Sequence, residues 1–217
     1  MPTLGYWKIR GRAQPIRLLL TYAGEEFEDV QYEQGDAPEF SRAAWTDVKP
    51  SFNDILDFPN LPYYIDGDVK ITQSNAILKH VARKHKLDGA NDTEKAHVDC
   101  MLDQAMDLRN GAVRLCYNKD YESLKEDYFK NVQPTLALFG KKLGNNDWFV
   151  GNKTTVADFP MYELLDHHLR MKADSLDAYP KLKAFLQRFS QLPKVKEYLA
   201  LDSVKNLPIN NKFAAFK

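Results

Sequence analysis

The feature of this sequence that most constrains its fold is a change of pattern near residue 85. Before it, short extended stretches alternate with helical ones, and after it apolar residues recur almost only at helical spacing. A chain of 217 residues can bury a core in each of two small domains. The order predicts an α/β unit over residues 1–85, a linker over 86–92 and an all-α unit over 93–217.

The first unit has clear start and stop signals. Residues 3–7 and 28–33 are predicted strands, and a helix between them begins near Pro15 and ends at Gly24. Two further strands, 63–65 and 69–71, flank the turn Asp66-Gly67 as a hairpin. A helix follows from Gln73-Ser74. The second unit shows helical spacing throughout, and Thr155 to Asp158 is typical of a helix capping box with an acid at its end.

Composition narrows the class of protein. Thirty basic and thirty acidic residues give a formal charge of zero without a basic block, so neither nucleic acid nor an anionic membrane is an expected partner. Cys100 and Cys116 are the only cysteines, too few for a disulfide framework. No apolar run reaches the ~20 residues of a membrane span, and we see no signal-peptide pattern at the N-terminus. We therefore expect a cytoplasmic protein.

Single motifs carry little functional information here. His167-His168 could suggest a metal ligand pair, but neighbouring residues point to different sides of a helix and no further ligand set accompanies them. Tyr6-Trp7 alone would be interpreted as core aromatics of a strand. There is no glycine-rich phosphate loop, serine elbow or Cys-x-x-Cys motif. We therefore predict no metal site.

Two segments together indicate a peptide-like ligand. In an α/β unit of this order a proline directly before a strand, as in Leu61-Pro62, is often cis and turns the preceding residue outward. The backbone of Leu61 would then be free to pair with an extended ligand. Gln73-Ser74 begins a helix, where free N–H groups attract a carboxylate. A peptide with a terminal carboxylate fits both features.

In the blocks that hold these residues the sequence resembles the glutathione transferase family, and within it the mu class. The resemblance covers nearly the whole chain and is carried by Leu4-Gly5-Tyr6-Trp7-Lys8-Ile9-Arg10-Gly11, Gln34-Gly35-Asp36-Ala37-Pro38, Leu56 to Pro62, Thr72 to Leu78, Cys116-Tyr117-Asn118, Gly151-Asn152-Lys153, Asp158-Phe159 and Asp177 to Leu182. It implies a thioredoxin-like N-terminal domain followed by a helical domain. It also implies detoxification chemistry, in which glutathione is a co-substrate and no cofactor is permanently bound.

The resemblance also implies residue roles. Tyr6 is the expected catalytic residue, whose hydroxyl donates a hydrogen bond to the thiolate of glutathione. The expected glutathione-binding residues are Trp7, Arg42, Trp45 and Lys49 at the glycyl end, Asn60 and Leu61 at the cysteinyl part, and Gln73, Ser74 and Asp107 of the partner subunit at the γ-glutamyl end. The expected electrophile site is formed by Ile9, Arg12, Tyr117, Asn210 and Asn211. Phe58 is expected to insert into the partner of a homodimer.

The sequence departs from the mu pattern in two places. The segment Pro50 to Leu56 is about two residues longer than usual, and proline after Lys49 favours an extended backbone at that lysine. Arg12 and Asn210 replace commonly apolar residues, and Arg109 lies on the helix that faces the same pocket. The two arginines could point to solvent with packed stems, or they could make the electrophile pocket unusually polar.

Three functions remain to be compared. The leading one is an enzyme that adds the thiol of glutathione to electrophiles. A non-catalytic ligand-binding protein of the same fold would be expected to lack Tyr6, which is present. A glutathione-dependent disulfide reductase would favour a cysteine near position 6, and there is none.

Overall fold

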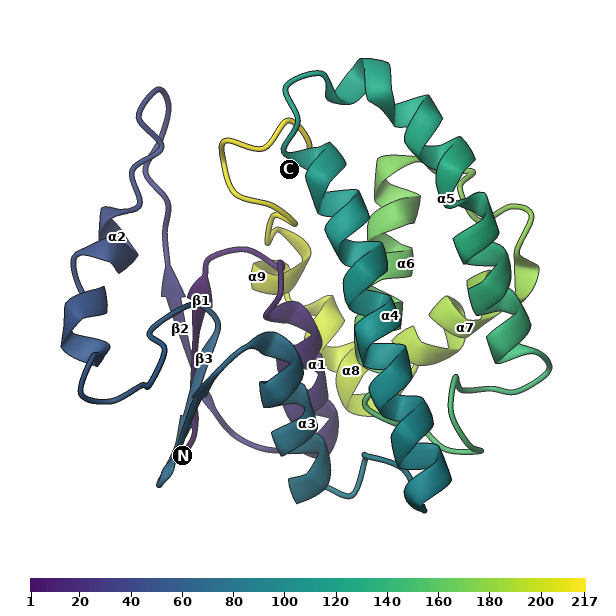
Figure 1. The fold of residues 1–217 in the computed structure, drawn as a ribbon, viewed down its shortest axis with the longest axis horizontal. Coiled ribbons are helices and arrows are strands. Elements are labelled where there is room, and N and C mark those ends of the chain that lie inside the picture. The colour runs from purple at the N-terminus through teal and green to yellow at the C-terminus, as the bar shows by residue number, and fades with distance from the viewer.

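The computed structural model describes all 217 residues and begins with a four-stranded sheet. Its strands are β1 (Thr3–Trp7), β2 (Glu28–Tyr32), β3 (Tyr63–Asp66) and β4 (Val69–Thr72), in the order β2-β1-β3-β4. β1 pairs in parallel with β2, from Thr3↔Glu28 to Trp7↔Tyr32, and antiparallel with β3. Helices α1 (Gln14–Ala23) and α3 (Ser74–Lys84) cover one face, and α2 (Ala43–Thr46) lies on the other side (Figure 1).

The second part of the chain is helical. It contains α4 (Asp92–Cys116), α5 (Tyr121–Leu143), α6 (Asp158–Met171), α7 (Pro180–Ser190), α8 (Pro193–Ala200) and the short α9 (Asp202–Lys205). The prediction of an α/β unit followed by an all-α unit is confirmed. None of these helices combines the length and apolarity that crossing a membrane requires.

Helix α1 joins the two parts because it is buried on nearly all sides. Pro15 occupies its first turn, and Gly24 ends it in the left-handed conformation (φ 72°), donating its N–H to the last turn. Leu18, Leu19 and Leu20 are all fully buried, since α1 contacts α3 on one side and α6 and α8 on the other. A single apolar cluster therefore runs from the sheet into the helical part.

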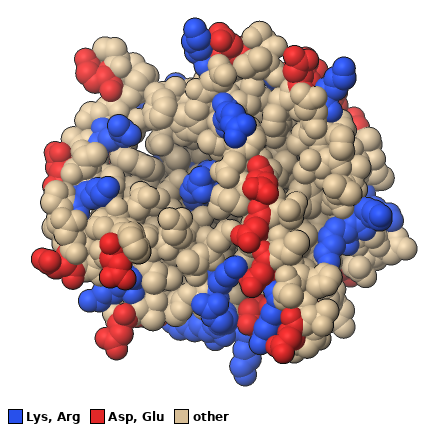
Figure 2. Space-filling model, in the orientation of Figure 1, with Lys and Arg blue, Asp and Glu red and all other residues tan.

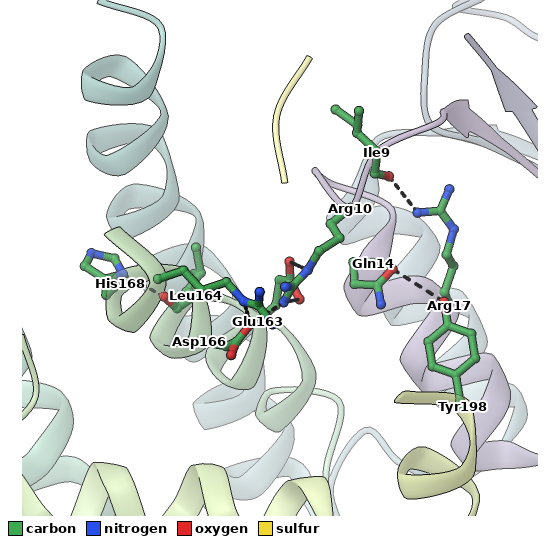
Figure 3. A network of polar contacts seen from close by, with 10 residues as sticks. Ile9, Arg10, Gln14, Arg17, Glu163, Leu164, Asp166, His168 and Tyr198 are labelled. Carbon is green, nitrogen blue, oxygen red and sulfur yellow. Dashed lines mark hydrogen bonds and ion pairs between the residues drawn. The ribbon is translucent and has the colours of Figure 1, made fainter. Parts of the chain in front are cut away.

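A buried ion-pair network fixes the same contact. Arg10, just after β1, donates to Glu163 at 2.9 and 2.7 Å and to Asp166 at 2.6 Å, both on α6 (Figure 3). Nearby, Arg17 donates to the carbonyl of Ile9 at 2.8 Å. Removing one partner of such a buried pair costs about 3–5 kcal/mol. The network thus holds the loop after β1 against α6.

The C-terminal segment returns to that loop. The N–H groups of Arg10 and Gly11 donate to the carbonyls of Pro208 and Ile209 at 2.7 and 3.1 Å. Farther along, the N–H of Ala215 donates to the carbonyl of Cys116 at the end of α4. The segment is therefore tied both to the β1–α1 loop and to α4.

One predicted motif forms only in part. In the capping box expected over Thr155 to Asp158, the N–H of Asp158 should donate to the hydroxyl oxygen of Thr155, but it donates to the carbonyl of Thr155 instead. The carboxylate of Asp158 does close the other half, accepting from the N–H of Thr155 at 2.8 Å and of Phe149 at 3.0 Å. Asp158 thereby anchors the loop before α6 to the start of that helix.

Candidate functional site

A hollow lies between the side of the molecule that carries α2 and the side that carries α4, and basic side chains border it (Figure 2). Tyr6, near the end of β1, is 6% exposed. Its hydroxyl oxygen accepts a hydrogen bond from the N–H of Arg12 at 3.2 Å. Because that bond uses a lone pair and not the proton, the hydroxyl can still donate to a further acceptor.

Gly11 makes this arrangement possible, and sequence reasoning gave it no role. Its φ is +45°, and a Cβ at this position would lie 2.6 Å from Cε1 and 2.8 Å from the hydroxyl oxygen of Tyr6. Real Cβ atoms essentially never approach so closely. The sequence does show a glycine between two arginines, directly before the start of a helix. The role of this glycine could not be predicted, because it depends on where the ring of Tyr6 lies.

The corner before β3 has the predicted conformation with one difference. The Leu61–Pro62 bond is cis, as its position before a strand indicated. The N–H of Leu61, expected to be free for a ligand, instead donates to Oδ1 of Asn60 at 2.9 Å. A strand-like ligand that pairs with Leu61 would have to displace the amide of Asn60, which lies next to it in the chain.

The start of α3 is open to an anion. Gln73 has a positive φ of 75°, an uncommon conformation outside glycine, and Ser74 is the first residue of the helix. No side chain of the protein caps this first turn. The free N–H groups and the helix dipole are therefore available to a carboxylate, as the sequence predicted.

The four residues expected at the glycyl end lie around a small aromatic cluster. Trp45 is 5% exposed and packs against Tyr63, Tyr32 and Phe52. Arg42, at the start of α2, and Lys49 are exposed, and neither side chain has a partner in the chain. Trp7, at the end of β1, is half-buried against the same cluster.

The expectation of an extended backbone at Lys49 is wrong. Lys49 begins a short 3-10 helix, η1 (Lys49–Phe52), with Pro50 in its first turn. The turn brings Phe52 against Trp45 and Tyr63, with ring centroids 5.4 and 4.8 Å apart. Packing of the partly buried Phe52 ring against these two aromatic rings outweighs the moderate preference that a following proline imposes on a lysine.

The residues expected at the electrophile site gather where the C-terminal segment meets β1 and α4. The hydroxyl oxygen of Tyr117 accepts from the N–H of Asn211 at 2.9 Å, and burial raises the pKa of Tyr117, so the phenol stays protonated at neutral pH. Asn210 is buried and donates to the carbonyl of Phe216 at 3.0 Å, which holds the segment in place. Ile9 is 6% exposed.

The C-terminal segment also contacts the loop after β2, next to the expected electrophile site. Lys212, on the C-terminal segment, lies 2.7 Å from Asp36 and 3.3 Å from Glu33, on the loop after β2. The rings of Phe40 and Phe213 from the same two segments are 6.3 Å apart. Both segments therefore meet beside Tyr117, whose ring centroid is 4.9 Å from that of Phe213.

Arg12 and Arg109 line a cavity at the contact between the two parts of the chain, together with Asn210. Both side chains are partly exposed, and the guanidinium of Arg12 is directed at Met106 and Asn110 of α4. Phe58 and Asp107, which are expected to act across a dimer, both lie on the exposed surface of the single chain, and 78% of Phe58 is exposed.

The histidine pair belongs to the core of the helical part. Nε2 of His168 bonds to the hydroxyl of Tyr128 at 2.8 Å and its Nδ1 to the carbonyl of Leu164, whereas His167 lies 3.5 Å from Sγ of Cys116. Burial raises the pKa of Cys116 to about 11, so this thiol stays protonated and is a poor nucleophile. No group of three or more His, Cys, Asp or Glu side chains is arranged to hold a metal ion.

Comparisons with known proteins agree with this geometry. Residues 2–83 match the model of the glutathione S-transferase N-terminal domain, and residues 106–202 match that of the C-terminal domain. The chain is 47% identical over 214 residues to glutathione S-transferase Mu 4 of Mus musculus, covering 99% of this chain and 97% of the relative. It is 47% identical over 211 residues to glutathione S-transferase Mu 3 of Homo sapiens, covering 97% and 93%.

Solved structures show the same architecture. The Pi-class glutathione S-transferase of Onchocerca volvulus superposes with a TM-score of 0.86 at 34% identity, over 98% of this chain and 99% of that one. The glutathione S-transferase Blo t 8 gives a TM-score of 0.88 at 31% identity, over 99% of each chain. The predicted fold, a thioredoxin-like domain followed by a helical one, is confirmed, and this chain belongs to the glutathione S-transferase family, in its mu class.

Proposed function

We propose that this protein ionises the thiol of glutathione with Tyr6 and transfers the thiolate to electrophilic small molecules. The observation that carries the proposal is the hydrogen bond from the N–H of Arg12 to the hydroxyl oxygen of Tyr6. It orients the phenol and leaves its proton to donate to a sulfur atom in the hollow. The electrophile binds beside it, toward Tyr117 and the C-terminal segment.

One hydroxyl is sufficient for this activation. A free thiol with a pKa of about 8.5 is only a few per cent thiolate at pH 7. Lowering that pKa by about two units requires roughly 2.7 kcal/mol of preferential stabilisation of the thiolate. A hydrogen bond to a charged group supplies about 1.5–3 kcal/mol. The donor from Tyr6 therefore accounts for most of the effect, and we propose no permanently bound cofactor.

We assign the tripeptide to three surroundings. The γ-glutamyl carboxylate lies at the uncapped start of α3, near Gln73 and Ser74. The cysteinyl backbone pairs with Leu61 after the amide of Asn60 has turned away. The glycyl carboxylate lies between Arg42, Lys49, Trp7 and the indole N–H of Trp45, since the two basic side chains have no partner within the chain.

We also propose that the working form is a homodimer. The resemblance to the family assigns Phe58 to the surface of a partner subunit, and this large apolar side chain is 78% exposed and so available for that contact. A groove of about 290 Å³ runs between α4 and α5, lined by Leu108, Tyr128 and Val132 and bordered by Asp107. A cavity of about 150 Å³ holds a benzene molecule, so this groove has room for a phenyl ring. In the dimer, Phe58 of one subunit packs on the α4–α5 face of the other, and Asp107 approaches the partner's γ-glutamyl end.

The dimer is tested with Phe58→Ser and a control, Leu201→Ser, which replaces another exposed apolar residue (52%) outside this face. Sedimentation should show that only Phe58→Ser weakens dimerisation, and its affinity for glutathione should fall together with the dimer fraction. A fully active monomer of the natural chain would contradict the proposal.

The catalytic proposal is tested by mixing the protein with glutathione and an activated aryl halide. Turnover well above the uncatalysed rate, lost in Tyr6→Phe, is the expected result. Binding of both compounds without turnover would instead identify a ligand-binding protein.

We further propose a cytoplasmic location, consistent with free thiols at Cys100 and Cys116. Cell fractionation tests this proposal.

A further inference from the structure

Two arginines beside the site have no carboxylate partner. Arg12, on the loop between β1 and α1, donates to Sδ of Met106 at 3.0 Å and to Oδ1 of Asn110 at 3.3 Å, and both acceptors are neutral. Arg109 lies on α4, one turn after Met106, and has no hydrogen bond or ion pair to any side chain. Burial is the largest influence on the pKa of its guanidinium and lowers that pKa. Two positive charges thus share this part of the cleft without compensation.

The surrounding charged groups do not neutralise them. Glu163 lines the same cavity, but both its oxygens accept from Arg10, as does Asp166. His167 also lines the cavity; burial lowers its pKa well below the usual range, so it is neutral and adds no charge. The charge of Arg12 lowers the pKa of Arg109, and Glu163, which forms no ion pair with Arg109, raises it only through its charge at a distance. The uncompensated positive charge therefore belongs to Arg12 and Arg109.

The cavity between them has a defined size. It measures about 30 Å³ and is lined by both arginines, Gly11, Asn210 and Ile209. A single water needs roughly 10–15 Å³ of such space, so the cavity admits a small polar group and not an entire aromatic molecule. The remainder of a bound electrophile would extend past Gly11 into the hollow beside Tyr6.

We propose that Arg12 and Arg109 form a subsite for a carboxylate carried by the electrophile, so that the enzyme prefers anionic aromatic acceptors over neutral ones of the same shape. The proposal rests on the function proposed above. An unpaired guanidinium in a partly buried site is costly, and an anionic acceptor removes that cost for both arginines. The start of α3, to which one carboxylate of glutathione is assigned, also borders this cavity through Ser74, so the preference must be measured with the glutathione site already filled.

A binding experiment tests the subsite without turnover. The protein is saturated with S-methylglutathione, whose sulfur cannot react, and titrated calorimetrically with unreactive 4-nitrobenzoate or 4-nitrobenzamide. The carboxylate should bind roughly 10- to 100-fold more tightly, as one charge-assisted hydrogen bond implies. Arg12→Leu and Arg109→Leu should each reduce this preference at least threefold, and Arg12→Lys should retain part of it.

The matched control is Arg114→Leu, which removes a positive charge from an exposed position on the same helix. It should keep the preference of the natural chain. Equal affinities for the two probes in the natural chain, or the same loss in Arg114→Leu as in Arg109→Leu, would overturn the proposal.

A kinetic experiment separates this subsite from the proposed function. The values of kcat/KM for 4-chloro-3-nitrobenzoate and its amide are each divided by the uncatalysed rate constant with glutathione. The normalised ratio should favour the carboxylate and fall in both leucine variants. Turnover of both acceptors with a ratio near one would overturn the subsite and leave the enzyme intact. Absence of turnover, with the preference kept in the binding experiment, would overturn the enzyme and support the subsite.

Discussion

Gly11→Ala should inactivate the enzyme by moving the hydroxyl of Tyr6, without changing Tyr6 itself. A Cβ at position 11 would lie 2.6 Å from Cε1 of the tyrosine ring. Carbon atoms in ordinary contact are about 3.5–4.0 Å apart, so the ring or the loop must move by about 1 Å. A misplacement of about 1 Å at a catalytic group can reduce the rate about 100-fold.

The variant also has a backbone cost, which a control isolates. The φ of +45° at Gly11 is unfavourable for alanine by about 1–2 kcal/mol. Gly67, in the β3–β4 turn, has a φ of +58°, and a Cβ there would meet nothing within 4 Å. Gly67→Ala therefore carries the same backbone cost without the clash.

The assay is kcat/KM with a neutral aryl halide at pH 7, accompanied by urea unfolding. We expect Gly67→Ala to lose about 1–2 kcal/mol of stability and Gly11→Ala to lose at least as much, and only Gly11→Ala to lose about 100-fold in kcat/KM. Gly11→Ala with the activity of Gly67→Ala would refute the argument, because it would show that the close approach to Tyr6 does not position the hydroxyl.

Two further predictions concern other contacts. Asp158→Ala leaves the N–H groups of Phe149 and Thr155 without their acceptor and should cost about 2–4 kcal/mol in urea unfolding, whereas the exposed Asp202→Ala should stay within about 0.5 kcal/mol. Lys212→Ala removes the ion pairs that join the C-terminal segment to the loop after β2, so a bound glutathione conjugate should dissociate roughly two- to fivefold faster in stopped-flow measurements. An unchanged dissociation rate that is also insensitive to salt would show that these contacts do not restrain the ligand.

The elements of the fold could be predicted because their signals are local. The strand over residues 3–7, the stop at Gly24 and the turn at Asp66-Gly67 depend on spacing and backbone freedom within a few residues. The backbone conformation at Lys49 could not be predicted from such local signals. Its turn depends on Phe52 reaching Trp45 and Tyr63, and Tyr63 is more than ten positions away in the chain.

In the candidate site, too, features set by local sequence could be predicted and features set by side-chain packing could not. The open start of α3 and the cis bond before Pro62 follow from short patterns, so the sequence indicated both. The bond between Asn60 and the N–H of Leu61 depends on a side-chain rotamer. The direction of Arg12 depends on the distance from the β1–α1 loop to Met106 on α4, which only the packed structure defines. Sequence reasoning therefore left open whether Arg12 faces the pocket.

The central claim, that Tyr6 ionises the thiol of glutathione, is tested most directly by the pKa of that thiol in the complex. Ultraviolet absorbance of the thiolate, followed against pH, should give a value of about 6.5 for the natural chain and for Tyr22→Phe, which removes a hydroxyl from α1. In Tyr6→Phe the value should return to about 8–8.5, with glutathione still bound. A thiol pKa that stays near 6.5 in Tyr6→Phe would contradict the account, because another group would then be stabilising the thiolate.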